Sequence, residues 1–345
     1  MRRDNSDLLT AAAFIGGAFL AGRWIYRRTQ RRDLRYQVVL VTGGSRGLGL
    51  ALSRALLDQG CHLAICARDE GELDRARQEL KGHGRHVLMY QCDVTDRASV
   101  NDMVQAVLQD YGGIDILVNN AGMISVGPLD SMTLGDFEKS MAVNFWGPLN
   151  VVWSVLPHMR EQGGGHIVNV TSFAGQVPVP HLVPYDCSKA AFMGLSEGMR
   201  AELARDNIDV TTVIPGLLHT GSPVNAEFKG NPEAEFAWFS ASDSMPLTSM
   251  SADRAARLIV ASMRQGGGQL TLGWQAKLLR AAHAVAPNAF SRALSVFNRY
   301  LPEDQGLPFT RAFGVELKRS ANAATQARVD QAGAHLNQHT RPTTP

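Results

Sequence analysis

The sequence predicts an α/β protein built on a doubly wound parallel sheet, and two observations support this. Short runs that are almost wholly apolar, such as residues 38–42, are typical of strands buried on both faces. Segments with apolar residues at helical spacing lie between these runs, as where Val100, Val104 and Val107 share one face. Strand and helix alternate in this way over residues 36–273, which indicates a parallel sheet covered by helices on both faces.

The predicted elements follow one another in a regular order. We expect strands at residues 38–42, 61–67, 86–92, 114–118, 167–170, 210–214 and 269–272. We expect helices at residues 47–57, 69–80 with Asp69 as the N-cap, 96–108, 134–159, 185–203 and 252–263. Pro148 is expected to bend or break the helix at residues 134–159, because proline has no backbone N–H to donate.

Three further segments complete the expected organisation around a single main domain at residues 36–273. Within it, residues 217–250 hold prolines and aromatic residues and are too long for an ordinary connection, which favours a lid over a binding site. Residues 274–316 carry apolar and basic residues at helical spacing, so we expect an amphipathic helical extension that lies on a membrane or packs on the core or a subunit partner. Residues 317–345 are polar and rich in alanine, and we expect them to be disordered.

The first 35 residues have the character of a membrane segment. Residues 8–22 carry no charge, and with the four that follow they approach the minimum length for a bilayer span. Arginines crowd the C-terminal flank, so the positive-inside rule places the rest of the chain in the cytoplasm. We therefore expect a single N-terminal anchor. A helix lying on the membrane, a partner-binding hairpin and a cleaved signal peptide remain alternatives.

Overall composition excludes some classes of function. The formal net charge is only +2, which gives no support for a nucleic-acid partner. The four cysteines (Cys61, Cys66, Cys92 and Cys187) match no zinc-binding spacing, and we expect reduced thiols and no metal site.

A glycine-rich turn follows the first predicted strand. Gly43, Gly47 and Gly49 lie between that strand and the next helix. Glycine lets the backbone approach a phosphate closely, and a helix N-terminus presents N–H groups and a positive dipole end. The spacing therefore predicts a site for the pyrophosphate of a dinucleotide, although it differs from the commonest fingerprint.

Tyr185 and Lys189 are four residues apart on a predicted helix, so they share a face. A lysine cation stabilises the phenolate of a nearby tyrosine and so lowers its pKa toward the range useful for proton transfer. The upstream hydroxyl of Ser172 can hold a substrate oxygen. These residues predict acid–base catalysis beside a bound dinucleotide.

These motifs together resemble the short-chain dehydrogenase/reductase family over residues 37–272. Residues 119–122 (Asn-Asn-Ala-Gly) resemble the family motif that stabilises the sheet and flanks the cofactor. Asp93 resembles the aspartate that contacts the adenine, and Pro215, Gly216 and Thr220 resemble the segment at the nicotinamide. The resemblance implies a Rossmann-type fold and a nicotinamide cofactor.

The resemblance also implies a role for each candidate residue. Tyr185 would act as the acid or base, Lys189 would tune it and bind the nicotinamide ribose, Ser172 would orient the substrate, and Asn144 would anchor a water of the proton relay. The cofactor-binding residues that it implies are Gly43, Ser45, Arg46, Gly47, Leu48, Gly49, Arg68, Asp93, Val94, Asn120, Ala121, Gly122, Tyr185, Lys189, Pro215, Gly216 and Thr220.

Local charge favours NADP(H) over NAD(H). NAD-binding members of the family carry an acidic residue at the end of the second strand, whereas this chain has Ala67 followed by Arg68. Arg46 lies in the glycine loop, and two guanidiniums suit a 2′-phosphate. NAD(H) remains the alternative, since Asp69 is placed to bind a ribose.

Four neighbouring residues are weaker candidates. Thr171 lies beside Ser172, and the family spacing alone separates the two hydroxyls. Cys187 is expected to be a small packing residue of the helix. His181 and His219 are expected to border the pocket as polar contacts.

We therefore expect an NADP(H)-dependent oxidoreductase that interconverts a carbonyl and an alcohol on a lipophilic substrate. The aromatic residues of the insertion and the amphipathic extension favour such a substrate. The alternatives are a 3-oxoacyl thioester reductase and a non-catalytic NADP-binding scaffold or redox sensor at the membrane. Members of the family commonly pair through the two long helices that carry Asn144 and Tyr185, so we also expect a homo-oligomer.

Overall fold

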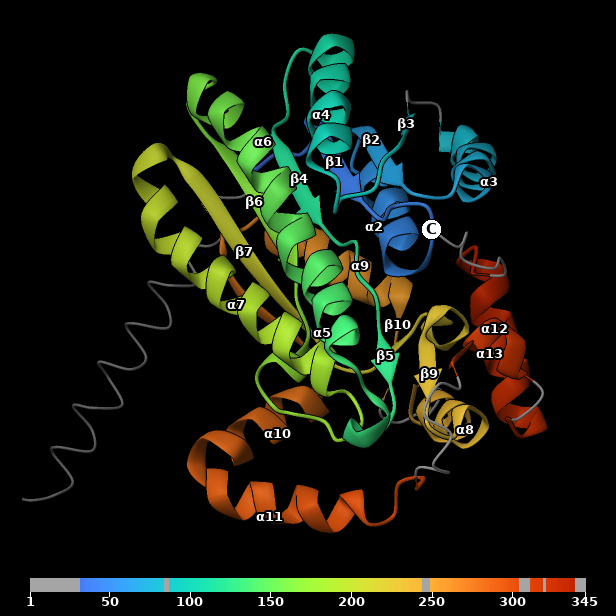
Figure 1. The fold of residues 1–345 in the computed structure, drawn as a ribbon. Coiled ribbons are helices and arrows are strands. Elements are labelled where there is room, and N and C mark those ends of the chain that lie inside the picture. Colours follow the sequence, from blue (N-terminus) through green and yellow to red (C-terminus); the bar gives the residue numbers. More distant parts are fainter. Residues whose placement is uncertain (1–31, 84–86, 244–248, 304–310, 319–320, 339–345) are drawn as a thin grey trace, which may run out of the picture.

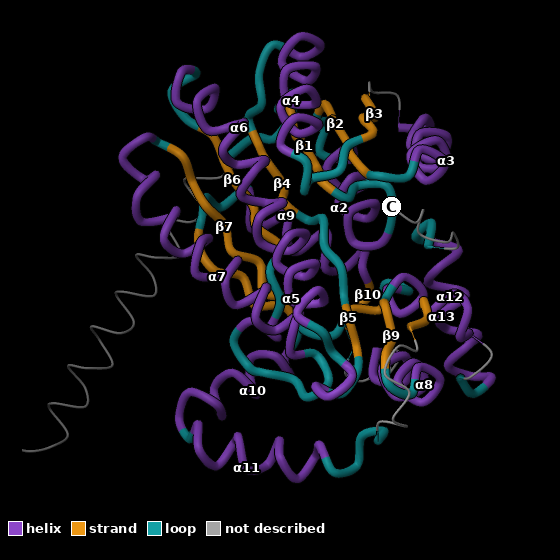
Figure 2. The backbone as a smooth tube through the Cα atoms, viewed as in Figure 1, coloured by secondary structure: helices purple, strands orange, loops and turns teal. Residues whose placement is uncertain are grey.

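A seven-stranded sheet forms the centre of the protein (Figures 1 and 2). The computed structural model describes residues 32–83, 87–243, 249–303, 311–318 and 321–338. The strand order is β11 (Gly268–Leu272), β7 (Ile208–Pro215), β6 (Gly165–Val170), β4 (Ile116–Asn119), β1 (Val38–Thr42), β2 (His62–Ala67) and β3 (Val87–Gln91). Each pair of neighbours is parallel, so the predicted parallel sheet is confirmed.

Helices cover both faces of this sheet, as the alternation predicted. One face carries α2 (Gly47–Asp58), α3 (Glu70–Leu80) and α9 (Ala252–Met263), and the other carries α4 (Arg97–Tyr111), α6 (Gly147–Glu161) and α7 (Val183–Leu203). Alternate residues of β1 face opposite cores. Val39 and Val41 pack under α2 and α9, whereas Val38 and Leu40 pack under α4 and α6. Burial on both faces explains why the strand sequence is continuously apolar.

The order in which successive strands are added to the sheet reverses between β1 and β4. Strands β1 to β3 extend to one edge, and β4, β6, β7 and β11 extend to the other. In open parallel sheets, ligands bind in the crevice outside the carboxyl ends of the strands at such a reversal. The topology therefore locates the candidate site before any side chain is considered.

The segment predicted as one long helix is divided. It consists of α5 (Leu134–Met141), a π-helical turn (Ala142–Trp146) and α6. Pro148, in the first turn of α6, has no N–H to donate to the carbonyl four residues earlier, and the chain accommodates this in the wider π turn. The expected break at Pro148 is thus present, and it lies next to Asn144.

The insertion at 217–250 contributes a small second sheet. It contains β8 (Leu218–His219), the 3-10 turn η6 (Ser222–Asn225), β9 (Glu227–Lys229), α8 (Pro232–Asp243) and β10 (Met250–Ser251). Strand β9 pairs with β5 (Ser125–Val126) on one side and with β12 (Arg311–Phe313) on the other. Phe228 and Phe236 are buried beside Leu182, and Tyr185 packs against this cluster. The aromatic residues of the insertion therefore form a core of their own next to the predicted catalytic helix.

Two helices extend from the body as the amphipathic pattern predicted. They are α10 (Trp274–Val285) and α11 (Pro287–Asn298), at the lower end of the molecule in Figure 1. Helix α11 has no buried residue, and α10 buries only Ala276. These two helices therefore present most of their apolar side chains to the surroundings.

The expectation of a disordered tail is wrong for residues 321–338. After α12 (Gly314–Leu317), the chain forms α13 (Ala323–His335), which packs near α8 and η6. Val329, Ala332 and Leu336 are buried at helical spacing. A Cβ added at Gly221 would lie 3.0 Å from the backbone nitrogen of Gly333, so small residues let the helix approach closely. The alanine-rich composition therefore serves close packing in this segment.

The predicted membrane span, residues 8–26, lies outside the described residues. Within the described ranges, no helix combines the length and the apolar character that a bilayer crossing requires. Residues 32–35, which we had grouped with the anchor, pack against the main domain. Arg32 forms a 2.6 Å ion pair with Asp209, and Leu34 is buried.

Candidate active site

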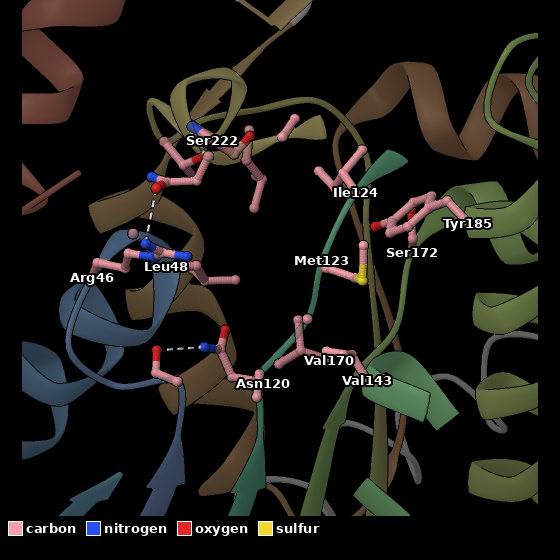
Figure 3. Close-up of a pocket in the computed structure, with 18 of the residues that line it drawn as sticks. Arg46, Leu48, Asn120, Met123, Ile124, Val143, Val170, Ser172, Tyr185 and Ser222 are labelled. Carbon is pink, nitrogen blue, oxygen red and sulfur yellow. Dashed lines mark hydrogen bonds between the residues drawn. The ribbon is translucent and has the colours of Figure 1, made fainter. Parts of the chain in front are cut away.

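A cavity of about 440 Å³ opens at the carboxyl ends of the central strands, where the sheet order reverses. This volume is in the range of small-molecule and cofactor sites. Figure 3 shows Arg46 and Leu48 on one side of the cavity and Ser172 and Tyr185 on the other. The two motifs that were far apart in the sequence therefore border one space.

The glycine loop is a tight turn in which glycine is needed at two positions. Gly43 has a positive φ of 63°, and a Cβ there would lie 2.9 Å from the Cα of Ala121. A Cβ at Gly49 would lie 2.0 Å from the carbonyl oxygen of Gly43. The first turn of α2, with Gly47 and Leu48, lines the cavity, and the preceding Arg46 gives no side-chain cap. The backbone N–H of Gly47 already donates to the carbonyl oxygen of Leu336 at 2.8 Å, so any anion at this turn would rely on the other N–H groups at the start of α2.

The segment after β4 fixes this loop in place. The side-chain nitrogen of Asn120 donates to the carbonyl oxygens of Thr42 at 3.2 Å and Gly43 at 3.0 Å. In return, the Thr42 hydroxyl oxygen accepts from the backbone N–H groups of Asn120 at 3.0 Å and Ala121 at 3.1 Å. These bonds join the ends of β1 and β4, which are the two strands that flank the reversal.

The arginine of the loop is held by a buried acid. The Arg46 guanidinium donates to Glu72 at 2.6 Å and to the side-chain oxygen of Asn225 at 2.9 Å. The Ser45 hydroxyl donates to the other oxygen of Glu72 at 3.1 Å. Glu72 is 3% exposed, so its carboxylate is buried together with these hydrogen-bond donors. Arg46 is therefore less available to a phosphate than the sequence suggested.

Arg68 and Asp69 lie at the end of β2 on the same side of the cavity. Arg68 is half exposed, and its guanidinium is 4.0 Å from Asp93, which makes a weak ion pair. The carboxylate of Asp69 accepts from the backbone N–H of Glu72 at 2.7 Å and so caps α3. Arg68 is thus free to turn toward a ligand, whereas Asp69 already serves the helix.

Helix α7 brings Tyr185 and Lys189 to the other end of the cavity. The Lys189 ammonium lies 5.8 Å from the centre of the Tyr185 ring and donates to the carbonyl oxygen of Val170 at 3.2 Å. Ser172 follows β6, and its hydroxyl oxygen accepts from the backbone N–H of Ala174 at 3.1 Å. This bond directs the hydroxyl of Ser172, which lies beside Tyr185 in Figure 3.

Burial dominates the proton affinities at this end. It raises the pKa of Tyr185 to about 12, and a hydrogen bond with Ser172 opposes part of this rise. Burial also lowers the pKa of Lys189 to about 8. Both shifts disfavour the charged form of the group, so the predicted lowering of the Tyr185 pKa by Lys189 is wrong, because burial outweighs it. Tyr185 is therefore a phenol at neutral pH and can donate a proton.

Asn144 is fully buried and does not border the cavity directly. Its side chain accepts from the backbone N–H of Met123 at 3.0 Å and donates to the carbonyl of Met123 at 3.1 Å and to the Ser188 hydroxyl at 3.0 Å. The π-helical turn directs this side chain inward, and such turns are frequent at functional sites. Asn144 thus ties the segment after β4 to helix α7.

Comparison with known families decides the identity. Residues 37–229 match the family model described as short chain dehydrogenase. The chain belongs to the short-chain dehydrogenase family. It is 36% identical over 200 residues to "Dehydrogenase/reductase SDR family protein 7-like" of Anopheles gambiae, a region that is 56% of this chain and 63% of that protein. It is 37% identical over 193 residues to "Dehydrogenase/reductase SDR family member 4" of Rattus norvegicus, which is 56% of this chain and 69% of the relative.

Solved structures agree with this assignment. A short-chain dehydrogenase from Streptomyces avermitilis superposes with a TM-score of 0.65 at 30% identity, over 76% of this chain and 98% of that one. An NAD+-bound xylitol dehydrogenase superposes with a TM-score of 0.61 at 26% identity, over 70% of this chain and 99% of that one. The alignments thus leave part of this short-chain dehydrogenase without a counterpart.

Three weaker candidates make hydrogen bonds outside the proposed chemistry. The Thr171 hydroxyl donates to the Val213 carbonyl at 2.7 Å, so it serves the sheet although it borders the cavity. His181 pairs with Glu235 at 2.7 Å, and His219 contacts the carbonyl of Arg328 at 3.2 Å. Neither histidine lines the cavity, contrary to expectation.

The cysteine prediction is partly wrong. Cys187 is exposed rather than packed, because it follows Tyr185 by two residues and so faces away from the cavity. Cys61, Cys66 and Cys92 are buried free thiols, as expected.

The structure adds cavity residues that the sequence did not indicate. Trp238, Phe239 and Glu227 come from the predicted insertion, whereas Lys139 and Arg311 lie outside every segment that was expected to border the site. Glu227 is buried and pairs with Lys139 at 2.9 Å and with Arg311 at 2.6 Å. These three residues are far apart in the chain, and only the pairing of β9 with β12 brings two of them together.

Proposed function

We propose that this short-chain dehydrogenase is an NADP(H)-dependent oxidoreductase that interconverts a carbonyl group and an alcohol on a lipophilic substrate. One observation carries the proposal: the glycine loop and the side chains of Tyr185, Lys189 and Ser172 border the same cavity. A dinucleotide laid across this cavity would reach from the loop to the proton-transfer residues.

The residues present fit such a cofactor. The contacts that a Cβ would make at Gly43 and Gly49 are with the backbone of Ala121 and of Gly43, so glycine at both positions keeps the tight turn that places the start of α2 at the cavity. Predicted cofactor residues that line the cavity are Gly43, Ser45, Arg46, Gly47, Leu48, Arg68, Asp93, Val94, Asn120, Ala121, Gly122, Tyr185, Lys189, Pro215, Gly216 and Thr220. Gly49 does not line the cavity and acts instead by letting α2 pack against Gly43.

The protein's own part in the reaction is proton transfer and positioning. A nicotinamide held in this cavity would supply or accept the hydride at the substrate carbon. Ser172 holds the substrate oxygen with its hydroxyl. Tyr185, a phenol at neutral pH, donates its proton to that oxygen in the reductive direction and takes it back in the oxidative one. The Lys189 ammonium stabilises the phenolate that remains.

The preference for NADP(H) rests on charge at the end of β2. Arg68 follows Ala67 where an acidic residue would select NAD(H), and its weak pairing with Asp93 leaves it able to meet a 2′-phosphate. Asp69 supports the same preference, because its carboxylate already caps α3. Arg68→Ala should weaken NADPH binding more than NADH binding, measured by fluorescence titration. Equal effects on both would contradict the preference.

The substrate proposal rests on the lining of the cavity. Trp238, Phe239 and Leu182 give it an apolar wall beside Tyr185, which suits a lipophilic carbonyl compound. A 3-oxoacyl thioester reductase is the second candidate, because Lys139 and Arg311 place two cations against one carboxylate at the cavity. Such an excess of positive charge would suit an anionic carrier or phosphate.

We further propose that α10 and α11 lie on an anionic membrane surface. Residues 274–300 contain Lys277, Arg280, Arg292 and Arg299 and no acidic residue. Exposed apolar side chains such as Leu278 and Val296 accompany them. This combination is typical of interfacial helices. The wild type should co-sediment with phosphatidylserine vesicles more than with phosphatidylcholine vesicles, and Leu278→Asp with Val296→Asp should abolish the difference.

A homo-oligomer that pairs through α6 and α7 also fits the surface. Trp153 is 71% exposed, and Trp146, in the turn before α6, is 48% exposed. Large exposed aromatic side chains favour an interface. Analytical ultracentrifugation should show a dimer or tetramer for the wild type and a smaller species for Trp153→Glu.

The function itself is tested by NADPH oxidation with a panel of steroid, retinal, long-chain ketone and 3-oxoacyl substrates. We expect turnover with the wild type and a loss of about a hundredfold or more with Tyr185→Phe, which removes the proton donor alone. Dinucleotide binding should survive in the variant. NADPH binding by the wild type without turnover of any substrate would favour a scaffold or redox sensor instead.

A further inference from the structure

The C-terminal segment reaches the glycine loop. Helix α13 ends at His335, and the next three residues, Leu336, Asn337 and Gln338, lie against the start of α2. In Figure 1 helices α12 and α13 lie beside α8 and β9 of the insertion. Residues 336–338 therefore lie where the phosphates of the proposed dinucleotide would be held.

The first contact caps helix α2. The backbone N–H of Gly47, the first residue of α2, donates to the carbonyl oxygen of Leu336 at 2.8 Å. A helix leaves its first N–H groups without partners in its own backbone, and Arg46 supplies no side-chain cap here. Leu336 thus satisfies one of these groups from a position about 290 residues away in the chain, and its side chain is anchored in the main core.

Asn337 connects the loop to the neighbouring helix. Its side-chain nitrogen donates to the carbonyl oxygens of Ser45 at 2.9 Å and Glu72 at 3.0 Å. Its side-chain oxygen accepts from Arg75 at 2.7 Å. The residue has a positive φ of 56°, a conformation that asparagine tolerates better than most residues. These bonds hold the outer side of the cavity at the glycine loop and the end of β2, where the adenosine of the proposed dinucleotide would lie; we call this the adenosine end.

Gln338 crosses to the opposite wall. Its side-chain nitrogen donates to the carbonyl oxygen of Thr220 at 2.7 Å, and its side-chain oxygen accepts from Asn225 at 2.9 Å. Gln338 is 4% exposed and lines the cavity. A Cβ at Gly47 would lie 2.6 Å from its side-chain nitrogen, so the glycine loop and the tail are fitted to each other.

We propose that Asn337 and Gln338 are part of the cofactor site and form a clasp that slows release of the bound dinucleotide. The clasp joins the two walls of the cavity, one at Ser45 and Gly47 and the other at Thr220. A cofactor lying between these walls can leave only after the bonds across them break. The inference rests on the proposed function, since it requires that a dinucleotide binds here.

The test is the rate at which bound NADPH leaves, followed by stopped-flow fluorescence during a chase with excess NADP+. In the double variant Asn337→Ala with Gln338→Ala, we expect release to be at least about tenfold faster, because several hydrogen bonds of about 1 kcal/mol each are lost. Leu336 is left in place, since it belongs to the core. A chain ending at Gln338 should release NADPH at the wild-type rate.

Gln331→Ala is the control, because it makes the same change as Gln338→Ala at an exposed position of α13. It should leave the release rate unchanged, and circular dichroism should show that all the variants are folded. Release at the wild-type rate, or slower release, from the double variant would overturn the clasp while leaving the proposed function intact. A wild-type chain that binds no dinucleotide would overturn both.

Discussion

The two ends of the cavity differ in whether their buried ionisable groups have partners of opposite charge. At the adenosine end, Glu72 is buried but accepts from Ser45 and Arg46, so its charge is matched by partners. At the catalytic end, burial raises the pKa of Tyr185 and lowers that of Lys189, because few partners compensate for the lost water. A buried charge with partners fixes the conformation of a loop. A buried group without them has a shifted pKa, which is typical of groups that exchange protons.

The largest expected effect is at the catalytic end, with Lys189→Met. The variant keeps the length of the side chain and removes its charge, so turnover should fall by about a hundredfold or more. In the wild type, carbonyl reduction should decrease as the pH rises through about 8, where Lys189 loses its proton. This inflection in the pH–rate profile should be absent in the variant. If it persists, another group controls the decline.

A second test introduces a steric clash in the glycine loop without changing any charge. Gly49→Ala places a Cβ 2.0 Å from the carbonyl oxygen of Gly43, so we expect destabilisation by about 1–3 kcal/mol and loss of dinucleotide binding. Gly198→Ala in α7 is the control, since no atom lies within 4 Å of its added Cβ. The control should be slightly stabilised, by about 0.5–1 kcal/mol. Chemical denaturation measures both.

Asp186 is another buried ionisable group near the catalytic end, and its shifted pKa makes the folding stability depend on pH. Burial raises its pKa to about 8 from 3.8, against a hydrogen bond from Val179 that favours the charged form. Between these values the folded state holds a proton that the unfolded state has lost. The stability that Asp186 contributes is therefore fully present below about pH 4 and is lost as the pH rises to about 8.

The variant Asp186→Asn should remove this pH dependence. Measured by urea unfolding, the free energy of unfolding of the variant relative to the wild type should rise from pH 4 to pH 8 and then level off. A constant difference over this range would show that Asp186 is charged in the folded protein.

The smallest expected effect is at the adenosine end, with Glu72→Gln. The substitution keeps hydrogen-bonding capacity but removes the negative charge that holds Arg46. Arg46 should then be more available to a 2′-phosphate, and the ratio of NADPH to NADH affinity should rise by several-fold. Fluorescence titration of both dinucleotides checks this, with Glu79→Gln as a control at a more exposed glutamate. An unchanged ratio would mean that Arg46 does not meet the 2′-phosphate.

The sequence by itself determined the parallel sheet and the place of the two main motifs. Both are local in character. Strands buried on two faces must be apolar throughout, and a phosphate loop must have glycine where Gly43 and Gly49 leave no room for a Cβ. Similarly, the four-residue spacing of Tyr185 and Lys189 fixes their common face on any helix.

Only the tertiary structure decided what surrounds these motifs. The pairing of Arg46 with Glu72 and the contact of Gln338 with Thr220 join residues 26 and 118 positions apart, and no local pattern records such distances. The tail was expected to be disordered because its composition offers little apolar surface. It folds because Val329, Ala332 and Leu336 fill a groove that the rest of the chain provides. The composition of a segment shows how much apolar surface the segment itself can bury. Whether the segment folds also depends on the surface of the rest of the protein against which it packs.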